Sequence, residues 1–142
     1  MRNQDMTRFN KSFWHIWLGL AFFFALPSWT VMAGSWTRDE VKIPVADGLE
    51  LKGEVLTPVG PLSPHSLPAV VFLNPFGQPM SVYKYQAEAY AADGYVVLRF
   101  NPRGWHGSQG KSTLDYWQVA ADAKNAISWL IDRYPVQEGR IG

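Results

Sequence analysis

The chain has 142 residues, of which 47% are hydrophobic and 18% are charged, enough apolar material for one packed domain. Its formal net charge of +1 argues against nucleic acid or an acidic surface as the partner. The absence of cysteine excludes disulfides, thiolate catalysis and cysteine-ligated zinc.

The N-terminal segment has the pattern of a targeting signal. Its basic residues are Arg2, Arg8 and Lys11. Residues 12–33 then carry no formally charged side chain, Pro27 ends any helix, and small residues lie at both positions that signal peptidase reads before Gly34. We expect a signal peptide cleaved after Ala33, which makes the protein secreted or periplasmic. The alternatives are an uncleaved membrane anchor formed by residues 12–33, since about 20 apolar residues span a bilayer, and a buried core helix.

A hairpin is the first element predicted in the remaining domain, residues 34–142. Residues 41–45 and 49–55 alternate between hydrophobic and polar side chains on either side of Asp47-Gly48. This pattern predicts an antiparallel hairpin with one buried face, because Asp-Gly is a strong turn signal.

A proline-rich loop follows at residues 57–68, since proline removes backbone donors and fixes φ. It contains His65, which we interpret as a solvated loop residue; a ligand role is the alternative.

Two apolar strands and a helix come next. Residues 69–73 and 95–100 are nearly continuous apolar runs, typical of strands buried on both faces of a parallel sheet. Between them, the periodicity predicts a helix over residues 81–93, capped by Ser81 and stopped by Gly94.

A second helix is predicted over residues 114–134, ended by Pro135, with residues 139–142 entering a third parallel strand. Its apolar stripe consists of Val119, Ala123, Ile127, Leu130 and Tyr134. The alternation of strands and helices predicts an α/β fold with a parallel sheet covered on both faces. Ligands bind such sheets beyond the carboxyl ends of the strands, where loops 74–80 and 101–113 are expected.

A nucleotide-binding protein is one alternative for such a fold. It requires a glycine-rich turn between strand and helix, and neither loop contains G-x-G-x-x-G or G-x-x-x-x-G-K-[ST]. The Gly110-Lys111-Ser112 triplet resembles the end of the second motif, but Trp105 stands where its first glycine is required.

Four segments in order resemble motifs of the α/β-hydrolase family. Residues 68–77 resemble the third strand with its oxyanion loop, and residues 91–98 resemble the entry to the fourth strand. Residues 101–110 resemble the R-G-x-x-x-S-x-G loop that follows that strand. Residues 122–130 together with 139–142 resemble the approach to the nucleophile elbow. The nearest groups are the Xaa-Pro dipeptidyl-peptidases and cocaine esterases, with dienelactone-hydrolase-like enzymes as neighbours. The resemblance implies the N-terminal half of an α/β-hydrolase fold, a hairpin leading into a parallel sheet flanked by helices.

The resemblance implies a serine hydrolase of the esterase or peptidase type, acting on acyl bonds through a Ser-His-Asp triad. By motif position, the backbone N–H of Phe76 is the expected oxyanion donor; the related group has a tyrosine there, whose hydroxyl is missing here. Asn74, Gly77, Arg103 and Gly104 are expected to shape the loops beside the site.

No serine of the chain fits the nucleophile position. Ser108 resembles one, but His106 stands where the elbow needs a small residue, so we expect Ser108 to be a structural loop residue. In family order all three triad residues follow Gly142, and the fragment alone is expected to be inactive. The alternative function is a non-catalytic binding or assembly module built on the same half-fold.

The remaining polar residues receive structural interpretations. Arg103 is expected to donate hydrogen bonds to backbone carbonyls, with binding of a substrate carboxylate as the alternative. The acids of the last helix are expected to be solvated: Asp115, Asp122 and Asp132. No metal or cofactor is implied, because the chain has no His, Asp and Glu cluster at ligand spacing. The expected partner is a small ester or peptide substrate.

Overall fold

The computed structural model describes residues 34–142, and the predicted signal peptide or anchor, residues 1–33, lies outside the described residues. In chain order the elements are β1 (Trp36–Pro44), β2 (Glu50–Pro58), β3 (Leu67–Leu73), the 3-10 helix η1 (Met80–Tyr83), α1 (Lys84–Ala92), β4 (Val96–Phe100), α2 (Tyr116–Arg133) and β5 (Val136–Ile141). Within the described range, no helix combines the length and the apolar character needed to cross a membrane.

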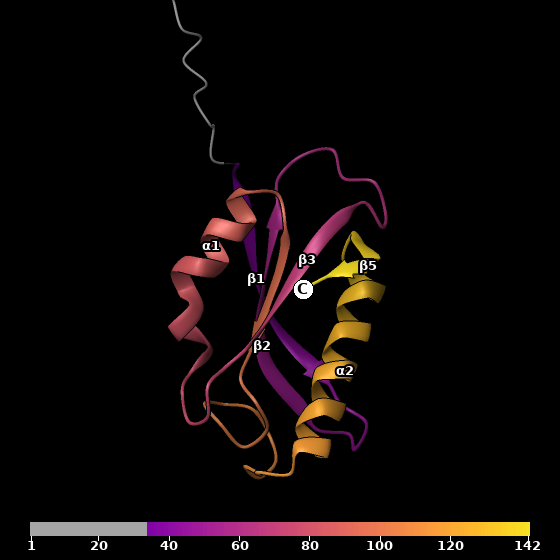
Figure 1. Cartoon of the computed structure of the whole chain (residues 1–142). Helices are drawn as coiled ribbons and strands as arrows, with labels where there is room; N and C mark the ends of the chain where they lie inside the picture. The colour runs from indigo at the N-terminus through magenta and orange to yellow at the C-terminus, as the bar shows by residue number, and fades with distance from the viewer. Residues whose placement is uncertain (1–33) are drawn as a thin grey trace, which may run out of the picture. The chain divides into compact units, whose positions relative to one another are not determined.

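A single five-stranded sheet organises these elements, with the strand order β1-β2-β4-β3-β5. β2 is antiparallel to both β1 and β4, whereas β3 is parallel to both β4 and β5. Figure 1 shows α1 on one side of the sheet and α2 on the other. The structure therefore has the predicted α/β fold, a hairpin leading into a parallel sheet flanked by helices.

The hairpin between β1 and β2 closes through a short loop at Asp47-Gly48, as predicted. The Val45 N–H donates to the Leu49 carbonyl at 2.9 Å, and the Gly48 N–H donates to the Val45 carbonyl at 3.0 Å. Gly48 has φ +78°, a left-handed conformation that glycine adopts without steric cost. Both strands extend further than the alternating pattern indicated.

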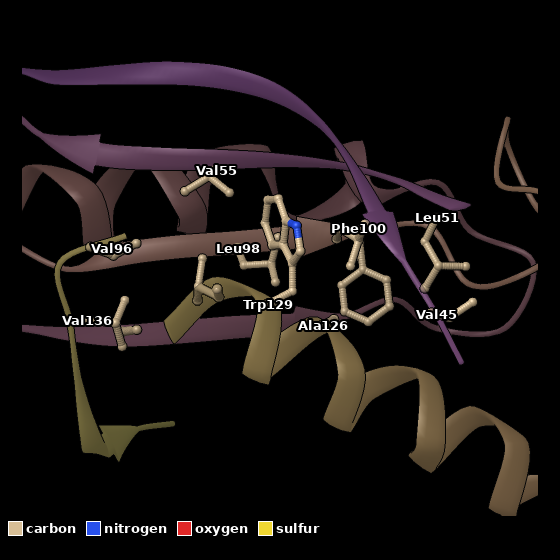
Figure 2. Packing of buried hydrophobic residues seen from close by; sticks show 12 residues of the cluster. Val45, Leu51, Val55, Val96, Leu98, Phe100, Ala126, Trp129 and Val136 are labelled. Carbon is tan, nitrogen blue, oxygen red and sulfur yellow. The ribbon is translucent and has the colours of Figure 1, made fainter. Parts of the chain in front are cut away.

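The larger core lies between the sheet and α2. Side chains from β1, β2, β4 and β5 meet Ala126, Trp129 and Leu130 of α2 (Figure 2). Burying a residue such as Leu130 fully contributes about 1.5–3 kcal/mol. A smaller core under α1 consists of Leu56, Ala87, Ala91 and Val97.

The predicted apolar stripe of α2 is confirmed at Leu130, which is fully buried, but the centre of the buried face lies about one residue away from the predicted one. The buried face consists of Asp122, Ala126, Trp129 and Leu130, whereas Val119, Ala123 and Ile127 are half-buried at its margin. One residue corresponds to about 100° around the helix. The sequence pattern missed this rotation because Asp122, a charged residue, occupies the centre of the buried face.

The start of the first predicted helix also differs. Residues 80–83 form a 3-10 turn, α1 begins at Lys84, and Ser81 makes no capping hydrogen bond. The Met80 N–H instead donates to the Asn101 side chain at 2.7 Å, so a residue from a distant loop replaces the local cap. Gly94, with φ +91°, follows the end of α1 as predicted.

The two inner parallel strands differ in burial. β4 is buried along its whole length, as predicted, but in β3 only Ala69 is fully buried and Leu73 is 52% exposed. The described helices pack chiefly over β1, β2 and β4, which leaves β3 less covered. β5 begins at Val136, earlier than the predicted residues 139–142, and runs parallel to β3 with an irregular register.

Candidate functional site

Two loops leave the sheet next to each other at the end where β3 and β4 finish. β3 and β4 are parallel, and Leu73 is opposite Phe100. The β3–η1 loop (residues 74–79) and the β4–α2 loop (residues 101–115) therefore emerge at the same end, seen at the bottom of Figure 1. We call this end the carboxyl end of the sheet. The prediction that these two loops lie side by side is confirmed.

The side chain of Asn101 joins the two loops through hydrogen bonds. Its side-chain oxygen accepts hydrogen bonds from the Asn74 side chain at 3.1 Å and from the Met80 N–H at 2.7 Å. Its side-chain nitrogen donates to the His106 carbonyl at 3.0 Å. Asn101 is only 3% exposed, so these bonds are made where little water competes for them.

A second set of contacts joins the outer parts of the loops. The ring of Phe76 meets the ring of Trp105 edge to face, with centroids 5.0 Å apart. The His106 Nε2 lies 3.1 Å from the Gly77 carbonyl oxygen. A carbonyl only accepts, so Nε2 must carry the proton and donate it. His106 reaches this position with φ +44°, a region that non-glycine residues rarely adopt.

The backbone around Phe76 offers unused donors. The Gln78 N–H donates to the Pro75 carbonyl at 3.0 Å and closes a turn, whereas the N–H groups of Phe76 and Gly77 find no acceptor among residues 34–142. Gly77 has φ +75°, and the side chain of Phe76 is 64% exposed. Two adjacent N–H groups at the carboxyl end of the sheet thus remain available to an anionic oxygen.

Arg103 connects the β4–α2 loop to helix α2 and to the turn between β1 and β2. Its Nε and one terminal nitrogen each donate to a different oxygen of Asp122, both at 2.6 Å, and its other terminal nitrogen donates to Asp47 at 2.8 Å. The hydrogen bonds with Asp122 and then Asp47 raise the pKa of Arg103 above its usual range. The hydrogen bond from Arg103 lowers the pKa of Asp47 from 3.8.

These contacts correct two predictions. Asp122 is not solvated but 3% exposed and bound to Arg103, and Arg103 donates to carboxylates rather than to backbone carbonyls. Two carboxylates already compensate the charge of Arg103 and occupy three of its N–H donors, which leaves little for a substrate carboxylate. Asp115 also has a structural role, since its side chain accepts from the Trp117 N–H at 2.9 Å and caps α2.

Gly104 and Ser108 allow the β4–α2 loop to fold back on itself. Gly104 has φ +73°, and a Cβ there would lie 2.1 Å from the Ser112 nitrogen, which only glycine tolerates. The Ser108 hydroxyl donates to the Asn101 carbonyl at 2.6 Å and accepts from the Lys52 N–H at 2.9 Å. Ser108 is therefore a structural loop residue, as expected, and its hydroxyl proton is already committed.

A hollow of about 280 Å³ lies between the two loops and the start of α2. Its aromatic and aliphatic lining includes Phe76, Trp105, Leu114 and Tyr116. A larger hollow of about 450 Å³ lies over the outer strands β1 and β2, where charged side chains surround it. The smaller hollow lies beside the unused N–H groups, because Phe76 and Gly77 are both among the residues that line it.

Sequence reasoning placed Phe76, Asn74, Gly77, Arg103 and Gly104 near this site, and the structure brings all five to the carboxyl end of the sheet. It missed two contributors. Asn101 and Trp105 belong to the segment of residues 101–110 that resembles a family loop, but the sequence predicts no role of their own for them. An Asn directly after a buried strand was the available signal, since its amide can bind two neighbouring loops. In the described part of the chain, no group of three His, Asp or Glu side chains is placed to hold a metal ion.

Comparison with known proteins identifies a family and similar solved structures. Residues 47–142 match the family of X-Pro dipeptidyl-peptidases (S15 family). An acetyl xylan esterase from Paenibacillus sp. R4 superimposes with a TM-score of 0.66 at 23% identity, over 75% of this chain and 40% of that chain. An esterase from Pyrococcus furiosus gives 0.61 at 27% identity, with the same two coverages of 75% and 40%.

A curated relative from Theobroma cacao, named probable 7-methylxanthine methyltransferase 5, is 32% identical over 110 residues. The match covers 75% of this chain but only 28% of that protein. The chain thus spans well under half the length of the relatives and structures that it matches.

Proposed function

Because this chain belongs to the X-Pro dipeptidyl-peptidase family of α/β-hydrolases, we propose that it is part of a serine hydrolase that cleaves ester or peptide bonds of small substrates. The triad of Ser, His and Asp or Glu is supplied by residues that follow Gly142 in the complete protein. The observation that carries the proposal is the unused Phe76 N–H at the carboxyl end of the sheet, between two loops fastened to each other.

In the proposed reaction, residues that follow Gly142 supply the triad, and this chain supplies one of the oxyanion donors. The serine attacks the substrate carbonyl carbon while the histidine takes the hydroxyl proton, and the carbonyl oxygen becomes negatively charged in the tetrahedral intermediate. The Phe76 N–H and the N–H of the residue after the serine donate hydrogen bonds to this oxygen. The intermediate collapses, the histidine passes its proton to the leaving group, and water releases the acyl group by the same steps.

The side chain of Phe76 has a separate role in this proposal. Phenylalanine has no hydroxyl, so this residue contributes to the oxyanion hole only through its backbone. Its ring packs edge to face against Trp105, and Asn74 is held by Asn101 on the other side of the turn. These contacts hold the donor still before the substrate arrives, and a donor that needs no reorganisation stabilises the transition state most.

The test uses the full-length protein, first with a fluorophosphonate probe that labels activated serines. The backbone donor is then removed by replacing Phe76 with phenyllactic acid, which turns the N–H into an ester oxygen and keeps the ring. We expect kcat to fall by about 10²–10³ with KM little changed. Phe76→Ala keeps the N–H and serves as the control, with a much smaller effect. Absence of probe labelling overturns the serine mechanism, and wild-type kcat in the phenyllactate variant overturns the role of Phe76.

Export is part of the same proposal. The charge pattern of residues 1–33 supports a signal peptide cleaved after Ala33. Among the described residues, the Gly34 nitrogen donates to the Ala92 carbonyl at 3.0 Å, a bond that a free amino terminus can also make. Mass spectrometry of the mature protein should give Gly34 as its first residue in the periplasm or medium. An intact Met1 in the membrane fraction would instead support the anchor formed by residues 12–33.

A further inference from the structure

The hollow at the carboxyl end lies against the proposed oxyanion donor. Phe76 and Gly77 form part of its wall, and the rest comes from the β4–α2 loop and the first residues of α2. A substrate carbonyl held by the Phe76 N–H therefore has one of its two substituents within reach of this space. What the hollow accepts then decides which substrates can react.

The hollow has an apolar surface formed largely by four side chains: Phe76, Trp105, Leu114 and Tyr116. Trp105 meets Phe76 edge to face, while Leu114 and Tyr116 are 72% and 86% exposed on the opposite side. Exposed aromatic and aliphatic side chains gathered beside a polar donor are typical of a pocket that binds an apolar group and orients it.

The charges of the lining residues also favour an uncharged occupant of the hollow. Arg103 is the charged residue of this hollow, and both of its sides are occupied by Asp122 and Asp47. No free cation or anion among the lining residues is left to compensate a charged substituent. A charged substituent entering here would find no opposite free charge among the lining residues, so no ion pair would compensate for the loss of its hydration.

The volume of the hollow is large enough for one substituent of a substrate but not for a whole substrate molecule. Pockets that enclose a whole drug-sized ligand measure about 300–1,000 Å³, and this hollow measures about 280 Å³. It suits a short alkyl chain or a single ring rather than a complete peptide or sugar chain.

We propose, on the basis of the function proposed above, that this hollow binds an uncharged apolar substituent of the scissile carbonyl, so that the enzyme prefers neutral medium-chain or aromatic esters over charged ones. Tyr116 and Leu114 are its specificity-determining residues. The group bound is the acyl chain or the alcohol of the ester, which share this chemistry, and the substrate series below distinguishes them.

The experiment measures kcat/KM of the full-length protein. One series varies the acyl group in p-nitrophenyl acetate, hexanoate and the singly charged succinate; the other varies the alcohol in ethyl and hexyl acetate. In one of the two series, we expect kcat/KM of the six-carbon substrate (the hexanoate ester or hexyl acetate) to exceed that of the shorter substrate, and of the succinate ester in the acyl series, by about tenfold or more. The series that shows this preference identifies the substituent bound.

Variants of α2 provide a matched comparison. Tyr116 and Trp117 are adjacent and both 86% exposed, but only Tyr116 lines the hollow. Tyr116→Ala should reduce the preference for the six-carbon substituent by about fivefold to tenfold, whereas Trp117→Ala should leave it unchanged. Leu114→Lys should shift selectivity towards the succinate ester by about tenfold, because it supplies the missing countercharge, and Trp117→Lys should not.

The outcomes separate this inference from the proposed function. Hydrolysis with equal rates for charged and neutral substrates, or variants at Tyr116 and Leu114 that behave like those at Trp117, overturns the inference and leaves the hydrolase assignment in place. Absence of turnover on every ester together with absence of probe labelling overturns the proposed function, and the inference fails with it.

Discussion

Two loops at opposite ends of the sheet contain the same unusual local feature. The β4–α2 loop carries His106 with φ +44°, and the β2–β3 loop (residues 59–66) carries His65 with φ +54°. Each ring has a nitrogen near a backbone carbonyl, 3.1 Å from Gly77 for His106 and 3.3 Å from Val136 for His65. At these two histidines the local conformation of the two loops is therefore alike.

Their surroundings differ. The β4–α2 loop is fixed by the buried side chains of Asn101 and Arg103, and by Ser108, whose hydroxyl bonds the backbone of β2. Residues 61–66 of the β2–β3 loop are all exposed, and their side-chain hydrogen bonds are the local one from the Ser66 hydroxyl to the Ser63 carbonyl and the one between His65 and the Val136 carbonyl. Buried polar partners, rather than backbone strain, distinguish a loop that holds a site from one that only connects two strands.

The largest effect expected from this difference concerns Arg103. Arg103→Met leaves the buried carboxylate of Asp122 without its partner and should lower the free energy of unfolding by about 3–5 kcal/mol. Arg38, nearer the other end of the sheet, pairs with Glu54 and Glu88 but is 37% exposed, so Arg38→Met should cost about 0–1 kcal/mol. Urea unfolding of the full-length protein measures both. Equal losses would show that the buried partners are not what sets the loops apart.

A glycine in each loop gives the next largest contrast. At Gly104 a Cβ would overlap the backbone of Ser112 and the φ of +73° is unfavourable, so Gly104→Ala should cost more than about 2 kcal/mol. At Gly60 a Cβ meets nothing within 4 Å, and no positive φ opposes it. Gly60→Ala should be neutral or stabilise by up to about 1 kcal/mol. Thermal unfolding of the two variants tests the contrast, which a stable Gly104→Ala protein would contradict.

The paired histidines test whether the difference reaches the site. His106→Gly and His65→Gly both relieve a positive φ and both remove a ring, so their effects on stability should be similar. Only His106 donates to the loop that carries Phe76. We expect kcat on a p-nitrophenyl ester to fall about tenfold for His106→Gly, with KM little changed, and to stay at the wild-type value for His65→Gly. Equal kcat in the two variants would exclude positioning by His106.

The smallest expected effect is a pH dependence at Asp47. Its pKa is lowered by the hydrogen bond from Arg103, so the pair contributes stability above the unfolded pKa, and this contribution is lost as the pH falls through the lowered folded value. Asp47→Asn should therefore be less stable than the wild type above pH 3.8, with the difference shrinking below it. Unfolding measured between about pH 6 and pH 2.5 gives the result. A difference independent of pH would mean that the carboxylate charge contributes nothing.

The parts of the fold that depend on neighbouring residues could be predicted from the sequence. The turn at Asp47-Gly48, the buried strand at residues 95–100 and the stop at Gly94 follow from local patterns, and the structure confirms each of them, with the strand observed at residues 96–100. The position of the β3–η1 loop beside the β4–α2 loop also follows, since parallel strands finish at the same end of a sheet.

The parts that depend on distant partners could not. Asp122 was expected in solvent because its burial requires Arg103, 19 positions earlier in the chain. Ser81 was expected to cap a helix because nothing local shows that Asn101, 21 positions away from Met80, binds the Met80 N–H instead. The oxyanion role of Phe76 stays a prediction, since it concerns an oxygen atom that belongs to a substrate.

The most direct test is a crystal structure of the full-length protein after reaction with a p-nitrophenyl alkylphosphonate, whose serine adduct imitates the tetrahedral intermediate. The account predicts a phosphonyl oxygen about 2.7–3.1 Å from the Phe76 nitrogen. An adduct whose oxygen is held by other groups, with the Phe76 N–H pointing away from it, would contradict the account.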